Sequence, residues 1–151
     1  MQDVKGDVEA FYKAAQAKSD LDMIRLLTTR SESHLNEVFA GYTAKYAVSM
    51  SNMIKKQFAG QMQTAFVSCV DYVDNRGLWF AKQFKSAMAG AGMVEDKLIR
   101  LILRLRATPL MQVTKDAYQS MTGKALDQRI ADETTGDHQK LIVALVNQPA
   151  L

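Results

Sequence analysis

The sequence predicts an all-α protein, and three observations lead to that class. Apolar residues recur at the spacing of one helical face in several stretches, no segment alternates with the period of a β-strand, and the 151 residues include only two prolines and eight glycines. Hydrophobic residues make up 48% of the chain and charged residues 23%, which fits a globular protein and is too apolar for a disordered one. The length allows one domain, or two small halves that share a core.

Three apolar stripes place helices along the chain. The first has the spacing i, i+3, i+4, i+7 and i+11 and comprises Leu35, Val38, Phe39, Tyr42 and Tyr46. The second comprises Met62, Phe66, Cys69, Val70 and Val73, which predicts that Cys69 is a small core residue. The third comprises Leu98, Ile99, Leu101, Ile102 and Leu105. Helix-breaking residues at Ser31, Gly60, 75–77, 108–109, 122–123 and 135–136 divide the chain into about ten short helices with brief connections.

Composition and charge exclude several classes of protein. No apolar run approaches the roughly 18 residues that a membrane-spanning helix needs, and the N-terminus lacks the cationic and then apolar pattern of a secretion signal. A single cysteine excludes an intrachain disulfide and a cysteine-rich zinc site, and we expect His34 and His138 at the surface or at helix caps. The net charge of +3 is a mild bias toward anionic surfaces. These features predict a cytoplasmic protein.

No pattern in the sequence is typical of an enzyme or of a nucleic-acid-binding protein. The sequence has no recognisable nucleophile with a neighbouring base, no paired carboxylates in an inferable cleft, and no phosphate-binding loop of the Gly-x₄-Gly-Lys type. Sparse aromatic residues and the modest net charge argue against a groove for nucleic acid. We therefore expect a binding or structural protein that is not an enzyme and takes no nucleic-acid partner.

An internal repeat is the most informative feature. Met23 to Leu27 matches Leu98 to Ile102 at an offset of 75 residues (98 minus 23). Further pairs match at an offset of 76, and they are Tyr42 and Tyr118, Met50 and Leu126, Ile54 and Ile130, Gly60 and Gly136, Val67 and Val143, and Val70 and Val146. A fixed period of this size predicts two copies of one helical module, at residues 1–75 and 76–151, each covering an apolar face of the other.

The two copies differ in a way that predicts a binding site in the second. Gly90 and Gly92 lie before the apolar stripe of the second copy, whereas the corresponding stretch of the first copy has no glycine. Glu133 of the second copy corresponds to Gln57 of the first (133 minus 76). A glycine loop and a carboxylate that are present together in one copy and absent together in the other are expected of a shared two-part site.

The chemistry of this pair predicts a calcium site. Glycines turn backbone carbonyls outward at low steric cost, and Ca²⁺ binds six to eight oxygen ligands. The carbonyls of Met88, Gly90 and Gly92 are candidate ligands, and Glu133 is a candidate bidentate ligand. A single carboxylate predicts weak affinity for the ion alone and stronger affinity when an anionic lipid phosphate completes the shell. The alternative is that the glycines mark a tight turn and that Glu133 is a solvated residue near a helix end.

These residues also carry a resemblance to the annexins, the calcium-dependent phospholipid-binding proteins built from five-helix repeats of about seventy residues. Residues 80–84, 87–92 and 98–100 resemble the entry to an annexin repeat, and residues 132–137 and 141–145 resemble its end. Residues 29–35 with Val38, Phe39 and Tyr42 resemble the third repeat of the family, and residues 75–81 resemble its junction with the fourth. The resemblance covers nearly the whole chain and amounts to two of the usual four repeats, as in a half-length relative or a fragment.

The resemblance implies specific roles for these positions. The family's calcium loop falls on Met88, Gly90 and Gly92, and its distal acidic ligand falls on Glu133. The first copy keeps the fold without the site. The second copy departs from the family pattern at Met93, where a threonine is usual, and at Val94, where an acidic residue is usual.

Two functions follow as hypotheses. The first is calcium-dependent binding to anionic phospholipid membranes from the cytoplasmic side, with the cation bridging the loop and Glu133 to lipid, and with self-association or further repeats supplying avidity. The second is a calcium-independent structural protein on the annexin scaffold with a cytoskeletal or other protein partner.

Overall fold

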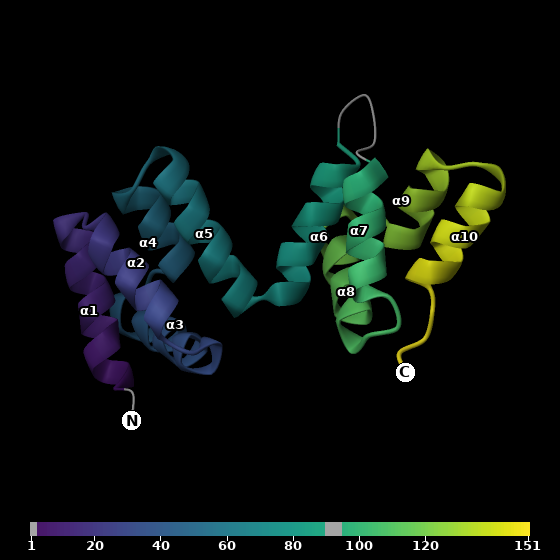
Figure 1. Cartoon of the computed structure of the whole chain (residues 1–151). Coiled ribbons are helices and arrows are strands. Elements are labelled where there is room, and N and C mark those ends of the chain that lie inside the picture. The colour runs from purple at the N-terminus through teal and green to yellow at the C-terminus, as the bar shows by residue number, and fades with distance from the viewer. Residues whose placement is uncertain (1–2, 90–94) are drawn as a thin grey trace. The chain divides into compact units, whose positions relative to one another are not determined.

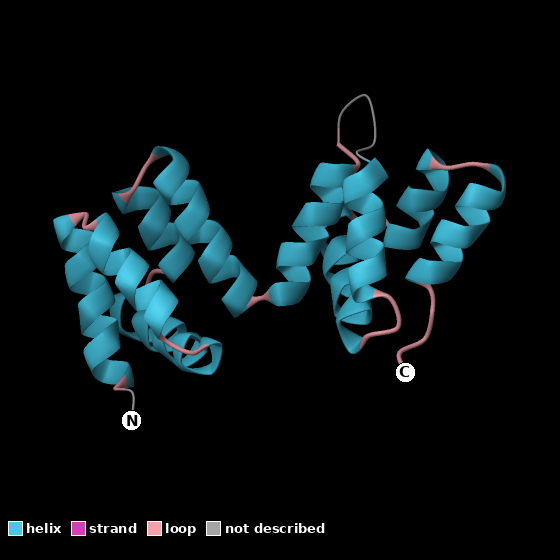
Figure 2. Ribbon diagram, in the orientation of Figure 1, coloured by secondary structure: helices cyan, strands magenta, loops and turns pink. Residues whose placement is uncertain are grey.

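The protein is all-helical over residues 3–89 and 95–151, which are the residues that this computed structural model describes (Figures 1 and 2). The chain divides into two compact units, Met1–Asp74 and Asn75–Leu151. The first unit contains α1 (Val4–Ala17), α2 (Asp20–Thr29), α3 (Glu32–Tyr46), α4 (Met50–Gln57) and α5 (Gly60–Asp74). The second contains α6 (Arg76–Ala87), α7 (Glu95–Leu105), α8 (Pro109–Thr122), α9 (Leu126–Glu133) and α10 (Gly136–Val146). Within the described residues, no helix combines the length and the apolarity needed to cross a bilayer.

Polar side chains fix where several of these helices begin. The hydroxyl of Ser31 accepts a hydrogen bond of 3.2 Å from the backbone N–H of His34, so Ser31 is the N-cap of α3. Asn75 caps α6 in the same way through its contact with the N–H of Leu78, at 3.1 Å. Each cap satisfies one of the backbone donors that the first turn of a helix leaves without an intrahelical partner. The predicted break at residues 75–77 therefore lies at Asn75, and Gly77 is already inside α6.

Corresponding residues of the two copies occupy corresponding places in the two cores. The pairs Tyr42 and Tyr118, Met50 and Leu126, Ile54 and Ile130, and Val70 and Val146 are all buried. Gly60 and Gly136 both begin a helix with positive φ, at 63° and 61°, a conformation that glycine adopts without steric cost. The 76-residue offset read from the sequence is thus also an offset between equivalent structural positions.

Two interpretations of individual side chains were wrong. Cys69 is exposed, because the buried face of α5 centres on Phe66 and Val70 and leaves Cys69 about 100° around the helix from Val70. His34 is a buried residue, not a surface or purely capping one, and its Nε2 lies 2.6 Å from Oδ2 of Asp7. Arg30 also binds this carboxylate, with its Nε 2.8 Å from Oδ2 and its Nη2 3.1 Å from Oδ1. Asp7, Arg30 and His34 form a largely buried polar cluster that ties together α1, α3 and the end of α2.

Candidate functional site

The connection between the first two helices differs between the units, and this difference positions the candidate site. In the first unit only Lys18 and Ser19 separate α1 from α2, whereas in the second unit residues 88–94 separate α6 from α7. Met88 directly follows α6, and its side chain is buried in the core with an exposed fraction of 3%. The predicted ligands Gly90 and Gly92, together with Met93 and Val94, lie outside the described residues.

Met88 and its counterpart in the first unit present their carbonyls differently. The buried residues Phe11 and Ala14 of α1 correspond to Phe84 and Ala87 of α6, which makes Ala15 the counterpart of Met88. The carbonyl of Ala15 accepts a hydrogen bond from the backbone N–H of Lys18 at 3.1 Å, within the helix end. The carbonyl of Met88 instead accepts a hydrogen bond of 2.9 Å from the side chain of Arg129 on α9.

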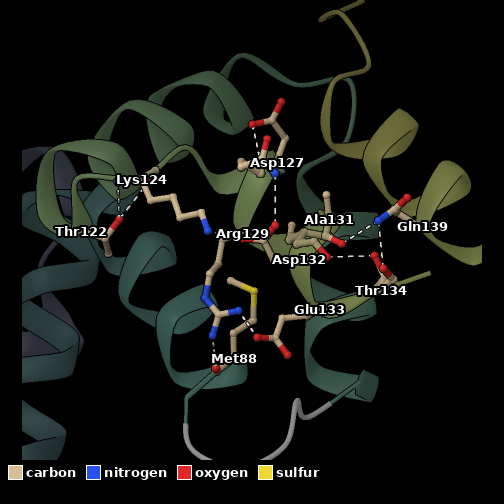
Figure 3. Close-up of polar contacts among 12 residues, drawn as sticks. Met88, Thr122, Lys124, Asp127, Arg129, Ala131, Asp132, Glu133, Thr134 and Gln139 are labelled. Atoms are coloured by element: carbon tan, nitrogen blue, oxygen red, sulfur yellow. Dashed lines mark hydrogen bonds and ion pairs between the residues drawn. The ribbon is translucent and has the colours of Figure 1, made fainter.

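Arg129 connects two of the residues that the sequence singled out. Its Nη2 donates to the Met88 carbonyl, and its Nη1 donates to Oε1 of Glu133, one turn further along α9 (Figure 3). In the close-up, the guanidinium lies between the two groups, with the backbone oxygen of Met88 on one side and the carboxylate on the other. The Met88 carbonyl lies at the end of α6, and the Glu133 carboxylate lies at the end of α9, 45 residues later in the sequence (133 minus 88). Both groups thus contact the same guanidinium, that of Arg129.

The charges in this region are arranged so that Glu133 faces Met88 while the neighbouring carboxylate does not. The hydrogen bond to Glu133 raises the pKa of Arg129, so the guanidinium remains charged. Asp132 is bound by Nζ of Lys124 and by Nε2 of Gln128, and the hydrogen bond from Lys124 lowers the pKa of Asp132. The Glu133 side chain is 33% exposed, so its carboxylate is accessible to solvent.

The turn that follows Glu133 is built in the same way in both units. Nε2 of Gln139 donates to the carbonyls of Ala131 and Thr134, at 2.6 and 2.9 Å. Gln63, its counterpart at the 76-residue offset, donates to the carbonyls of Lys55 and Phe58, at 3.1 and 2.7 Å. Because the turn is equivalent, Gln57 occupies the position of Glu133, and the first unit differs there in the side chain alone. The position of Arg129 is occupied by Met53, which is buried in the first unit.

The two described oxygens of the candidate site, one carbonyl and one carboxylate, are of the type that binds a hard cation. Across residues 3–89 and 95–151, no three histidine, cysteine, aspartate or glutamate side chains gather in a group that could hold a metal. One carboxylate and one carbonyl already converge on a positively charged group, and these oxygen types are the ligands that Ca²⁺ prefers. The described part of the site therefore fits calcium better than a transition metal that binds nitrogen or sulfur.

Sequence reasoning missed Arg129. One pattern contained the information: Arg129 lies four residues before Glu133 on a helix, a spacing that brings the two side chains together. The internal repeat also indicated Arg129, since Arg129 replaces Met53 just as Glu133 replaces Gln57. Gln63 and Gln139 were also missed, although they match at the same offset as the apolar pairs.

Comparisons with known proteins agree with this architecture. The family model described as Annexin matches residues 3–69 and 79–145. Annexin A1 of Equus caballus is 34% identical over 142 residues, which cover 92% of this chain and 41% of that protein. Annexin C1 of Cryptococcus neoformans is 30% identical over 96% of this chain and 32% of its own length.

Solved structures give the same result for the fold. The structure of annexin III superimposes with a TM-score of 0.85 at 28% identity and covers 97% of this chain and 45% of that one. A calcium-bound annexin (Sm)1 has a TM-score of 0.85 at 24% identity, a likeness in fold alone. The chain spans less than half the length of these curated relatives and solved structures.

Proposed function

Because this chain belongs to the annexin family, whose members bind phospholipids in a calcium-dependent way, we propose that it binds anionic phospholipid membranes peripherally through one calcium site in its second unit. The observation that carries the proposal is that the Met88 carbonyl and the Glu133 carboxylate converge on one positively charged group, the Arg129 guanidinium. We place this activity at the cytoplasmic face of membranes and assign the chain no catalytic role.

The proposed ligands are the carbonyls of Met88, Gly90 and Gly92 and the carboxylate of Glu133. A bound calcium ion would supply a doubly charged centre with coordination positions left for lipid phosphate oxygens. The chain's own residues do the rest: the buried Met88 side chain anchors the start of the loop, and the Gln139 hydrogen bonds hold the turn after Glu133. The first unit keeps the turn but offers the neutral Gln57 and a two-residue connection, so we assign it no calcium site.

Sedimentation with phosphatidylserine vesicles, with and without millimolar calcium, tests this function. We expect the wild-type chain to pellet with the vesicles only when calcium is present, and Glu133→Gln to lose most of that binding because one bidentate anionic ligand becomes a single neutral oxygen. Glu37→Gln is the matched control, since it removes the same charge from an exposed position of the first unit. Pelleting that is indifferent to calcium, or equal in Glu133→Gln and wild type, would reject the proposal.

One observation favours a second candidate function, a calcium-independent scaffold for a cytoskeletal or other protein partner. The guanidinium of Arg129 joins the two candidate ligands, so a side chain of this protein supplies the positive charge between them. In this alternative the chain keeps the annexin fold and binds its partner, or a second copy of itself, equally well with a chelator. Partner binding that disappears on removal of calcium would count against it.

A further inference from the structure

We propose that Arg129 is a built-in competitor for calcium: in the ion-free protein its guanidinium binds the oxygens of Met88 and Glu133, and it must leave before those oxygens can bind the ion. This inference rests on the calcium site of the proposed function and adds to it a residue that sets the calcium threshold.

The contacts of Arg129 are the first support. Its two terminal nitrogens are both engaged, Nη2 with the Met88 carbonyl at 2.9 Å and Nη1 with Oε1 of Glu133. A calcium ion in contact with the same two oxygens would take the lone pairs that these N–H groups use and would lie next to a like charge. Arg129 and the ion therefore compete for these oxygens, and each makes binding of the other weaker.

The surroundings make displacement of the guanidinium feasible. The Arg129 side chain is 28% exposed and the Glu133 side chain 33% exposed, so the guanidinium has a path into solvent when it leaves the partly buried Met88 carbonyl. The neighbouring carboxylate of Asp132 already binds Lys124 and Gln128. Displacement of the guanidinium costs one ion pair and one hydrogen bond near the surface, a modest penalty.

The first unit supplies the variant that isolates this effect. Met53 occupies the position of Arg129 and is buried in an equivalent helix with an equivalent following turn. Arg129→Met therefore places in the second unit the side chain that the fold already accepts at this position in the first. Arg129→Gln is a second variant, which keeps a polar side chain and removes only the charge.

Calorimetric titration of the full chain with calcium, in the absence of lipid, tests the proposal. We expect Arg129→Met and Arg129→Gln to bind calcium about three- to tenfold more tightly than wild type, the range that follows from releasing a surface ion pair and its hydrogen bond. Lys124→Met is the charge-matched control: it removes one positive charge and an ion pair from the same unit but contacts neither Met88 nor Glu133. We expect its affinity to match that of wild type.

Three results would overturn the proposal. Affinity that is unchanged or weaker in both Arg129 variants would mean that Arg129 orders the ligands and does not compete. Equal tightening in Lys124→Met would mean that net charge, not direct competition, sets the affinity. Failure of every variant to bind calcium up to about 10 mM, beyond the weak end of protein calcium sites, would remove the competition altogether. Because no lipid is present, the titration stays decisive even when vesicle binding, and with it the proposed function, fails.

Discussion

Asp7 is a carboxylate that the fold keeps charged in a largely buried place. Its side chain is only 11% exposed, and the hydrogen bond from Arg30 lowers its pKa below the ordinary value of 3.8, with a further contribution from His34. A carboxyl group whose pKa is lower in the folded than in the unfolded state stabilises the fold above the unfolded pKa, and this stabilisation is lost as the pH falls through the folded pKa. Asp7 therefore contributes to the acid sensitivity of the first unit.

Replacement of Asp7 by asparagine tests this contribution. We expect Asp7→Asn to lower the free energy of unfolding at pH 7 by about 2 kcal/mol, because Arg30 loses its charged partner in a partly buried site. The loss should begin to shrink as the pH falls below the unfolded pKa of about 4 and should disappear below the lower folded pKa, where the wild-type carboxyl is also protonated. Urea unfolding at several pH values measures both effects. Asp137→Asn, at a fully exposed carboxylate, is the control, and an equal loss in both variants would contradict the assignment.

At the scale of single residues, the sequence singled out two groups that the structure brings together, the Met88 carbonyl and the Glu133 carboxylate, but not the Arg129 side chain that joins them. Met88 and Glu133 could be named because a glycine loop and a carboxylate differ together between the copies. Arg129 could not be singled out because the chain has 19 basic residues, and most arginines on amphipathic helices point into solvent. Its partner in the loop is a backbone carbonyl, and every residue carries one, so the sequence gives no signal for that contact. The roles of Gly90 and Gly92 stay a prediction.

At the scale of helices, the close approach of α6 to α8 depends on Gly77. A Cβ atom on Gly77 would overlap Cγ1 of Val113 and would lie 3.3 Å from the Val113 backbone. We expect Gly77→Ala to lower the free energy of unfolding by roughly 1–3 kcal/mol, as overpacking of a close contact does, although alanine is the better helix former. Chemical denaturation measures the loss.

A double-mutant cycle identifies the cause of that loss. In a Val113→Ala background the overlapping methyl group is gone, so the same glycine substitution should cost at least about 1 kcal/mol less. An unchanged cost would mean that the contact with Val113 does not limit the approach of the two helices.

Helix positions were easier to predict than the exact faces that the helices bury. The stripes and the breakers predicted the helices of the described residues, since periodic apolar residues and capping residues act locally. The burial of Cys69 was predicted wrongly because a stripe of five apolar residues does not show which of them face the neighbouring helices. Gly77 was taken as part of a break because a glycine in a sequence does not distinguish a turn from a close helix contact. The burial of Cys69 and the role of Gly77 both depend on tertiary packing.

At the scale of the whole molecule, the proposed function rests on a single candidate calcium site in a chain that spans less than half the length of its relatives. It covers 41% of annexin A1 of Equus caballus, and its first unit offers Gln57 in place of the acidic ligand. A single weak site gives little avidity on a membrane. The boundaries at residues 75 and 76, and the assignment of a lost site to the first repeat, remain predictions.

A tandem fusion of two copies of the chain tests the role of avidity. We expect the fusion, joined by a flexible linker, to pellet with phosphatidylserine vesicles at a calcium concentration roughly tenfold or more below that needed by the single chain, because the second contact becomes intramolecular. A fusion with Glu133→Gln in one copy should behave like the single chain. A fusion with two intact sites that needs as much calcium as the single chain would argue that one copy already binds with full strength, or that the copies cannot reach the surface together.

The bridge made by Arg129 has a consequence for the stability of the second unit when calcium leaves the proposed site. A chelator removes a dissociable ion and commonly loosens the segments that the ion held together, but it cannot extract a guanidinium that is tethered to the chain. Under the proposed competition, the ends of α6 and α9 would stay joined through Arg129 after calcium leaves, so the second unit would pass through cycles of ion loss and rebinding without refolding.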